Sequence, residues 1–176
     1  MVASIRVGYA MLASGETKKV NGNHTLHLFS NANSHFLRHQ AQDRIQTIVK
    51  YFFHKLTNDP VWEDAVDAGL LSCPLAEDWE QRQCHSHIVP IRTRPRHEQY
   101  LFFHMSLAGM NAYNISYPVV PKGSSRIRMV FHAHNTEQEA DTAVAAICGW
   151  AAEMLEIEDG ASNATLPKAA LQVYAM

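Results

Sequence analysis

The sequence predicts an α/β domain of the α+β kind, in which a small antiparallel or mixed sheet is covered by helices on one face. Three observations favour this class. From residue 43 onward, the predicted elements run helix, short helix, strand, helix, strand, strand, helix. The last strand alternates apolar residues with arginines, which is typical of a sheet with one buried face. The length of 176 residues suits about one domain, and 47% of the residues are hydrophobic, enough for a core.

The first clear helix is predicted from Asp43 to the Asn58-Asp59-Pro60 stop, because proline disfavours helix in the residue before it. Its apolar stripe recurs at steps of three and four residues, as Ile45, Ile48, Val49, Phe52 and Leu56. The stretch VWEDAVDAGLLS predicts a short second helix that ends near Gly69.

The middle of the chain predicts strand, helix, strand. HSHIVPI, residues 85–91, reads as a strand, and Pro90 within it favours an edge or a bulge. Residues 94–109 predict a helix that ends where Gly109 stands in the usual position of a terminating glycine. The stretch MNAYNISYPVVP, residues 110–121, predicts the next strand.

The helix with the strongest sequence signals is predicted to begin after Thr136. Thr136 and Glu139 have the Thr-x-x-Glu spacing of a capping box, in which each side chain satisfies a backbone N–H at the helix start. An apolar face at helical spacing continues to Met154. From residue 159 the patterning weakens, so we expect residues 159–176 to form a loose tail.

Residues 1–42 carry weaker signals. Residues 4–13 look helical, and the polar, turn-rich residues 14–23 follow them. Residues 22–42 are rich in histidine and asparagine and poorly periodic, with several turn-forming breakers. We interpret residues 22–42 as an insertion, and a retained intron is one hypothesis for its origin.

Composition argues against several classes of partner. The net charge of −2 offers no general basic field for nucleic acid, and no apolar run approaches the roughly 20 residues of a membrane span. Three widely spaced cysteines suit a reducing compartment better than a disulfide framework. We therefore expect a cytoplasmic protein without a membrane span or a nucleic-acid partner.

Eleven histidines raise the question of a metal site. Three pairs have spacings that can place two imidazoles on one face: His35/His39, His85/His87 and His132/His134. No third ligand stands at a diagnostic spacing from any pair. We therefore predict no metal ligand, and a histidine-rich metal-binding module remains only as an alternative function.

The stretch YPVVPKGSSRIRMVFHAHNT, residues 117–136, contains the strongest functional signal. Alternation places Ile127, Met129, Phe131 and Ala133 on one face of a strand, which reads as core. Arg126 and Arg128 then lie on the other face, together with Val130, His132 and His134. A strand that buries one face and presents guanidinium groups on the other either faces water or lines a cleft for an anion.

The same stretch, together with the residues around it, resembles the C-terminal domain of the α-oxoamine synthases, pyridoxal-phosphate (PLP) enzymes of the class I/II aminotransferase superfamily. Five features carry the resemblance in the family's order: Gly109, Tyr117-Pro118-Val119-Val120-Pro121, Gly123, Arg126-Ile127-Arg128, and Asn135-Thr136 before a helix. The earlier Ile88-Val89-Pro90 resembles the strand that opens the family's small-domain sheet. The match covers roughly residues 43–157.

The resemblance implies a fold, a reaction and one site residue. The fold is the small domain of transferases with the aspartate aminotransferase fold, and the reaction is decarboxylative condensation of an amino acid with an acyl thioester. The second arginine of the Arg-x-Arg pair, here Arg128, binds the α-carboxylate of the amino acid. A guanidinium suits this role because it offers two parallel donors and a permanent charge. Arg126 is expected to be a structural or rim charge.

Departures from the family pattern limit what the chain can do. The usual histidine before the helix threonine is Asn135 here, which points to a divergent branch similar to enzymes of fungal secondary metabolism. None of the lysines lies in the family's cofactor-binding context, and Lys122 belongs to a Pro-Lys-Gly turn. We therefore predict no catalytic and no cofactor-binding residue in this chain, and no covalent PLP.

Under this resemblance the chain divides into four parts. Residues 1–21 are a remnant leading out of a missing large domain, 22–42 the insertion, 43–158 the small C-terminal domain, and 159–176 the tail. The leading hypothesis is a truncated synthase domain that is inactive alone. The alternative is a non-catalytic partner of a full-length paralogue, so we expect a homo-oligomer or such a heteromer.

Overall fold

The structure, a computed structural model, describes the backbone of residues 28–175 and the side chains of residues 40–175. The chain divides into two compact units, 1–39 and 40–176, and the site described below belongs to the second. In chain order the elements are α2 (Leu28–Thr57), α3 (Pro60–Asp67), β1 (Leu71–Ser72), the 3-10 helix η2 (Trp79–Gln81), β2 (Ile88–Thr93), α4 (Glu98–Leu107), β3 (Tyr113–Ile115), β4 (Arg126–Val130), α5 (Glu137–Glu158) and α6 (Lys168–Tyr174).

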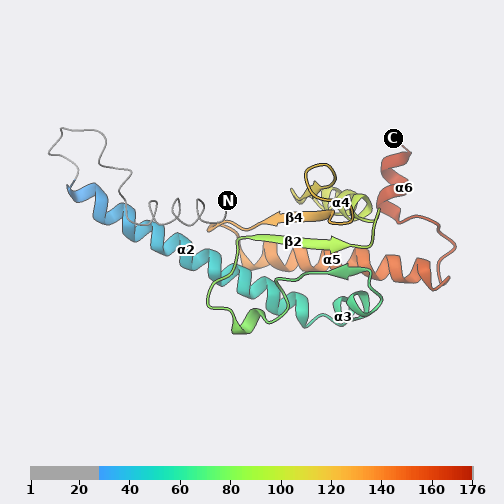
Figure 1. The fold of residues 1–176 in the computed structure, drawn as a ribbon, viewed down its shortest axis with the longest axis horizontal. Helices are drawn as coiled ribbons and strands as arrows, with labels where there is room; N and C mark the ends of the chain where they lie inside the picture. The colour runs from blue at the N-terminus through green and yellow to red at the C-terminus, as the bar shows by residue number, and fades with distance from the viewer. Residues whose placement is uncertain (1–27, 176) are drawn as a thin grey trace. The chain divides into compact units, whose positions relative to one another are not determined.

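The described strands form one antiparallel sheet in the order β1-β2-β4-β3. The two central strands, β2 and β4, run side by side, and the long helix α5 lies along them (Figure 1). The predicted α+β class is therefore confirmed, with an antiparallel rather than a mixed sheet.

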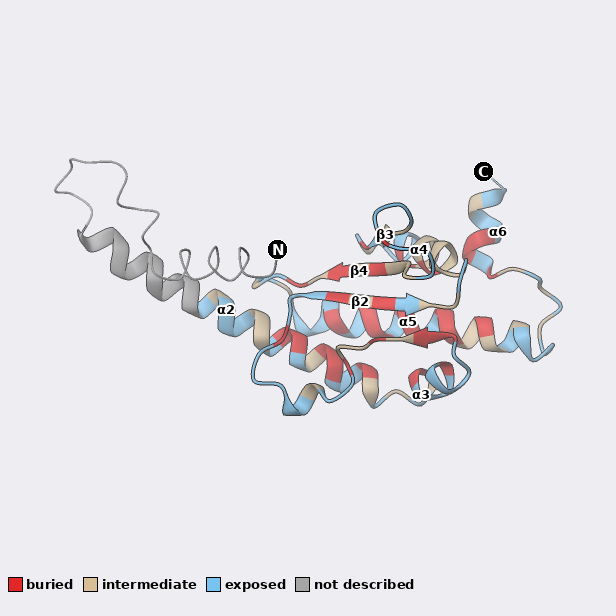
Figure 2. Cartoon of the chain, in the orientation of Figure 1, coloured by how far each residue is buried: buried red, intermediate tan, exposed pale blue. Residues whose placement is uncertain are grey.

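One face of this sheet builds the core. Val89, Ile91 and Ile127 are fully buried, and the apolar stripes of α2 and α5 belong to the same hydrophobic cluster. The rings of Phe52 on α2 and Phe131, which follows β4, lie 5.0 Å apart between centroids. Figure 2 shows buried positions alternating along β4 and forming a stripe on α5. The predicted apolar face of the Arg-x-Arg strand is thus confirmed for Ile127, Met129 and Phe131, while Ala133 is half-buried.

The predicted helix ends are also confirmed. The Thr136 side chain accepts a hydrogen bond from the Glu139 backbone N–H, and the Glu139 carboxylate accepts one from the Thr136 backbone N–H. The bond from the Thr136 backbone N–H, together with one from the Asn135 side chain, lowers the pKa of the Glu139 carboxyl. Gly69 and Gly109 follow α3 and α4 with φ values of +66° and +78°, which glycine adopts without a Cβ clash.

A side-chain amide fixes α2 against the chain before β2. Gln46 Nε2 donates to the backbone oxygen of His85 at 2.8 Å, and Gln46 Oε1 accepts from the backbone N–H of His85 at 2.7 Å. His85 is 5% exposed, and its imidazole packs against the rings of Phe53 and Trp79. Burial, reinforced by the charges of Lys50 and Arg82, lowers the pKa of His85.

Several boundaries differ from the prediction. Helix α2 begins at Leu28 rather than Asp43, so residues 28–42, expected to be an unpatterned insertion, are helical. The prediction of a loose tail from residue 159 is wrong for residues 168–174, because α6 buries Ala169 and Ala170. The predicted helix and turn at residues 1–21 lie outside the described residues.

The strands are shorter than predicted. Residues 85–87 precede β2 rather than belonging to it, and of the strand predicted over 110–121 only Tyr113–Ile115 is paired. β1 was not predicted, because two residues are too few to show alternation.

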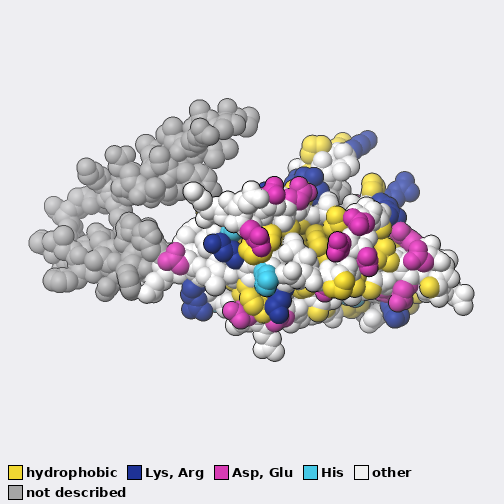
Figure 3. All heavy atoms as spheres, turned by 90° about the horizontal axis from the view of Figure 1, so that it is seen from below, with side chains coloured by type: hydrophobic (Ala, Val, Ile, Leu, Met, Phe, Trp, Pro, Cys, Tyr) yellow, Lys and Arg dark blue, Asp and Glu magenta, His cyan; other side chains and the backbone are white. Residues whose placement is uncertain are grey.

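The surface carries charges of both signs. On the face seen in Figure 3, Lys and Arg side chains are interspersed with Asp and Glu. Among residues 28–175, no helix combines the length and the apolar character needed to cross a membrane.

Candidate anion-binding site

Arg128 lies on β4, on the face of the sheet opposite the core. Its cross-strand neighbours are Pro90 on β2 and Tyr113 on β3. Directly opposed residues of antiparallel strands point to the same side of the sheet. The three side chains therefore form a row across the outer face, with the arginine in the middle.

The Tyr113 ring and the Arg128 guanidinium are in contact. The Arg128 Cζ atom lies 5.3 Å from the centroid of the ring, within cation–π range. The Nε atom of Arg128 is buried and has no hydrogen-bond partner among the described residues. Buried donors nearly always have a partner, so this position suits an acceptor atom of a ligand.

A cavity of about 500 Å³ opens on this face, and we call it the arginine cavity. It is lined by Arg92, Arg126 and Arg128, with apolar residues around them that include Ile88 and Val119. No Asp or Glu belongs to its lining. The ion pairs found among the described side chains, Lys55–Asp141 and Arg94–Glu158, involve none of these three arginines. Three guanidinium groups without a neighbouring carboxylate make this cavity suitable for an anion.

The sequence singled out only part of this cavity. Arg128 was predicted as the carboxylate ligand, and Arg126 was predicted as a rim charge, but both line the same cavity. Arg92 was missed, although it alternates with Ile88 and Pro90 along β2 and could have been found from that pattern. Tyr113 was missed because its position opposite Arg128 depends on the pairing register, which one sequence does not reveal.

The histidine pairs do not assemble a metal centre among the described side chains. His132 and His134 are exposed, and their rings stack in parallel with centroids 5.4 Å apart. His85 is buried whereas His87 is exposed, so this pair does not share a face. His35 and His39 lie outside the residues whose side chains are described. Within residues 40–175, no three His, Cys, Asp or Glu side chains gather where they could hold a metal ion.

The buried thiols are unsuited to nucleophilic chemistry. Burial raises the pKa of Cys73 to about 11 and that of Cys148 to about 12. Both therefore stay protonated at neutral pH, whereas the thiolate is the reactive form. Cys73, Cys84 and Cys148 are all free of disulfides.

The described residues do not fit covalent PLP. Lys50, Lys55, Lys122 and Lys168 are exposed. Neither the arginine cavity nor a second cavity beside α4 and α5 has a lysine in its lining. Lys18 and Lys19 lie outside the described residues.

Comparison with known proteins finds two curated relatives, both named aminoacyl transferase sphA. The protein from Aspergillus fumigatus is 42% identical over 175 residues, and the protein from Byssochlamys spectabilis is 39% identical over 175 residues. Each alignment covers 99% of this chain but 33% of the relative. The chain thus spans about a third of the length of the curated relatives it matches. No family model matches the chain.

The aligned span has a bearing on residues 22–42. Because it covers 99% of the chain, it includes nearly all of this segment. The intron hypothesis for its origin stays a prediction.

Proposed function

We propose that this chain is the small domain of a PLP-dependent aminoacyl transferase of the α-oxoamine synthase type, and that Arg128 binds the carboxylate of its amino-acid substrate. The complete reaction would join the amino-acid Cα to the acyl carbon of a thioester, with release of carbon dioxide and the thiol. The cofactor and its lysine would come from a large domain, either on a longer polypeptide or on a full-length paralogue.

The single observation that carries the proposal is the environment of Arg128. Its Nε is buried without a hydrogen-bond partner in residues 40–175, and it lines a cavity with three arginines and no acidic residue. A carboxylate placed there would accept a hydrogen bond from the Arg128 Nε–H group and would neutralise part of the positive charge of the arginines. The two relatives named aminoacyl transferase support a substrate that contains an amino acid.

The residues of this chain would bind and orient the substrate. Tyr113 would keep the guanidinium plane in place, and the apolar side chains of Ile88 and Val119 would limit access of water to the ion pair. PLP, when bound to the large domain, would supply the electron sink that this chain lacks. Arg128 would hold the carboxylate so that the Cα bonds keep one orientation relative to that cofactor.

The outer face of the sheet supports packing against a second domain. Val119, which lines the arginine cavity, is 78% exposed, and Tyr117, two residues before it between β3 and β4, is 61% exposed. Ile88 is also exposed and lines the same cavity, and exposed apolar side chains that lie together indicate an interaction surface. The large domain is the partner that we expect there.

A chimeric enzyme tests the proposal. The matching third of the A. fumigatus relative is replaced by this chain, and release of carbon dioxide and free thiol is measured with a panel of amino acids and a decanoyl thioester. We expect turnover that requires added PLP, with the purified 176-residue chain inactive on its own. A folded, PLP-loaded chimera that releases neither product, beside an active unaltered relative, would contradict the proposal.

The alternative of a non-catalytic partner subunit is distinguished from the proposed function by adding this chain to the intact relative as a separate polypeptide. If the chain copurifies with the intact relative and alters its turnover, while the chimera is inactive, the non-catalytic role is favoured.

A further inference from the structure

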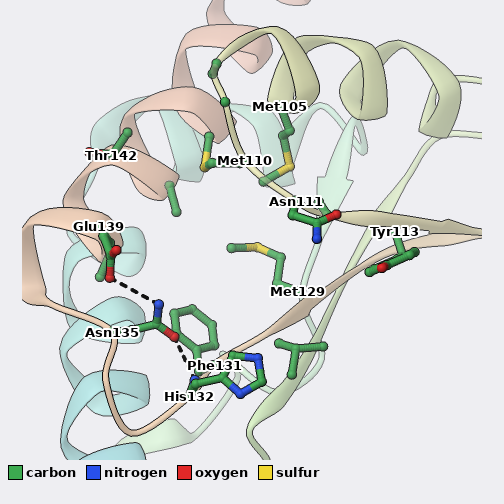
Figure 4. A pocket seen from close by; sticks show the side chains of 16 residues that line it. Met105, Met110, Asn111, Tyr113, Met129, Phe131, His132, Asn135, Glu139 and Thr142 are labelled. Carbon is green, nitrogen blue, oxygen red and sulfur yellow. Dashed lines mark hydrogen bonds between the residues drawn. The ribbon is translucent and has the colours of Figure 1, made fainter.

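The second cavity lies at the other end of β4 and has a different lining. It has a volume of about 670 Å³ and is bounded by the end of α4, the start of β3, the end of β4 and the first turns of α5. Met105, Met110 and Met129 line it, together with Phe131 and small residues of α5. We call it the methionine cavity. Figure 4 shows the labelled methionine side chains on facing sides of this space.

The cavity exists because β3 is short. β3 pairs with β4 only as far as Tyr113 opposite Arg128, so Met129 and Val130 have no partner on β3. Beyond that point the chain between α4 and β3 turns away, and Gly109 takes a positive φ of +78°. A space therefore remains beside the end of β4, where a longer strand would otherwise pair.

Two of the polar side chains at its rim, Asn135 and Glu139, are engaged in hydrogen bonds. Asn135 Oδ1 accepts from the His132 backbone N–H at 2.7 Å, and Asn135 Nδ2 donates to Glu139 Oε2 at 3.1 Å. Glu139 also caps α5. These bonds tie Asn135 and Glu139 to each other and to the backbone (Figure 4), and thioether, aromatic and alanine side chains make up the larger part of the remaining lining. Methionine side chains adapt readily to apolar chains of varied shape.

We propose that the methionine cavity binds the aliphatic chain of an acyl ligand. Its volume lies in the usual range of ligand pockets, and its lining is apolar with a few polar groups at the edge. Tyr113 lines the methionine cavity and its ring contacts Arg128, which lines the arginine cavity, so the two cavities are neighbours. A carboxylate site and an apolar chain site as neighbours match the two halves of an acyl–amino-acid condensation. The identification of the aliphatic group as part of an acyl donor rests on the proposed function. The cavity and its lining are observed independently of that function.

A chain-length series tests the inference on the full 176-residue chain. Hexanoyl, octanoyl and decanoyl thioesters of N-acetylcysteamine are titrated by calorimetry, each below its critical micelle concentration. We expect the affinity to rise about threefold to fourfold per added methylene. An affinity that does not change with chain length would overturn the proposal.

Two tryptophan substitutions at exposed alanines localise the binding. Ala108 lines the cavity and is exposed, so Ala108→Trp should obstruct it and lower decanoyl affinity at least tenfold. Ala145 is exposed on α5 outside the lining, and Ala145→Trp should leave affinity within twofold. If both variants lose decanoyl affinity equally while their melting temperatures are unchanged, the decanoyl group binds outside the methionine cavity.

A methyl NMR measurement keeps the inference testable if Ala108→Trp fails to fold. With ¹³C-methyl methionine, the decanoyl thioester should shift the signals of Met105, Met110 and Met129 but not that of Met154, which is buried outside this cavity. Shifts confined to Met154, or none at all, would count against it. Arg128→Gln should retain these shifts, which separates failure of this inference from failure of the carboxylate site.

Discussion

On the inner face of the sheet, Val89, Ile91 and Ile127 are fully buried, whereas the outer-face residues that alternate with them, Pro90, Arg126 and Arg128, are half-buried. The same two strands supply both sets. The inner set contributes to stability through burial of apolar surface. The outer set gains little from burial, and its arginines lack acidic partners among the described residues. Along β2 and β4, the residues that stabilise the domain and the residues that line the arginine cavity therefore lie on opposite faces.

Truncation on the inner face should have the largest effect. Ile127→Ala removes buried side-chain volume and leaves a cavity, so we expect a loss of about 2–5 kcal/mol in the free energy of unfolding. Ile88→Ala is the matched control, because Ile88 is 39% exposed on the outer face and should cost much less. Urea denaturation measures both. Similar losses would mean that the outer face is covered in solution.

Neutralising Arg128 should come next, and it should affect binding rather than stability. In the active chimera, Arg128→Gln removes charge-assisted hydrogen bonds to the carboxylate, and we expect kcat/KM for the amino acid to fall about ten- to hundredfold. Arg126→Gln, on the same face and the same strand, should reduce it less. Arg128→Lys should recover only part of the loss, since an ammonium lacks the planar pair of donors. If the two glutamine variants are equally impaired, the cavity acts through its total charge and Arg128 has no special role.

Removal of a helix cap should lower the free energy of unfolding moderately, without changing either face of the sheet. Thr136→Ala deletes the acceptor for the Glu139 backbone N–H, and we expect a loss of about 0.5–2 kcal/mol. Thr142→Ala is the control, because its hydroxyl donates only to the Gln138 backbone oxygen within the same helix. Thermal unfolding compares the two, and a Thr142→Ala loss as large as that of Thr136→Ala would argue against the cap as the cause.

The smallest expected effect is a pH dependence from the buried histidine beside the core. The pKa of His85 is lowered in the folded state, so the unfolded chain binds the proton more readily. This contribution to stability is fully present above the ordinary histidine pKa of about 6.5 and is lost as the pH falls toward the lower folded value. His85→Gln should flatten the fall in melting temperature between neutral and mildly acidic pH. His87→Gln, an exposed change two residues away, serves as control, and identical profiles for all three proteins would refute the assignment.

The comparison of faces also shows what one sequence reveals. Alternation located the buried face of β4, because hydrophobic burial leaves a period of two in the sequence itself. The Thr136 cap and the Gly109 turn were also predicted, because each depends on residues that lie within a few positions of one another in the sequence. Arg128 was identified through the family resemblance together with this alternation, and its role stays a proposal.

Features that depend on distant contacts were missed. Helix α6 is short, and Ala169 and Ala170 are buried where it packs near α4, as the edge-to-face contact of Phe103 and Tyr174 shows. Isolated helices of such length are marginal, so tertiary packing decides them. The Tyr113–Arg128 stacking and the methionine cavity likewise follow from where β3 stops pairing, which no local pattern records.

The Gln46 amide has a consequence for how α2 is placed. It offers one donor and one acceptor to the two main-chain groups of a single residue, as a neighbouring strand would. A shift of the helix by one position would break both bonds together and leave two polar groups unmatched. This one side chain therefore fixes the position of α2 along its axis relative to the chain that enters β2. Gln46→Glu keeps the shape of the side chain but removes the donor, so one of the two bonds that hold this position would be lost.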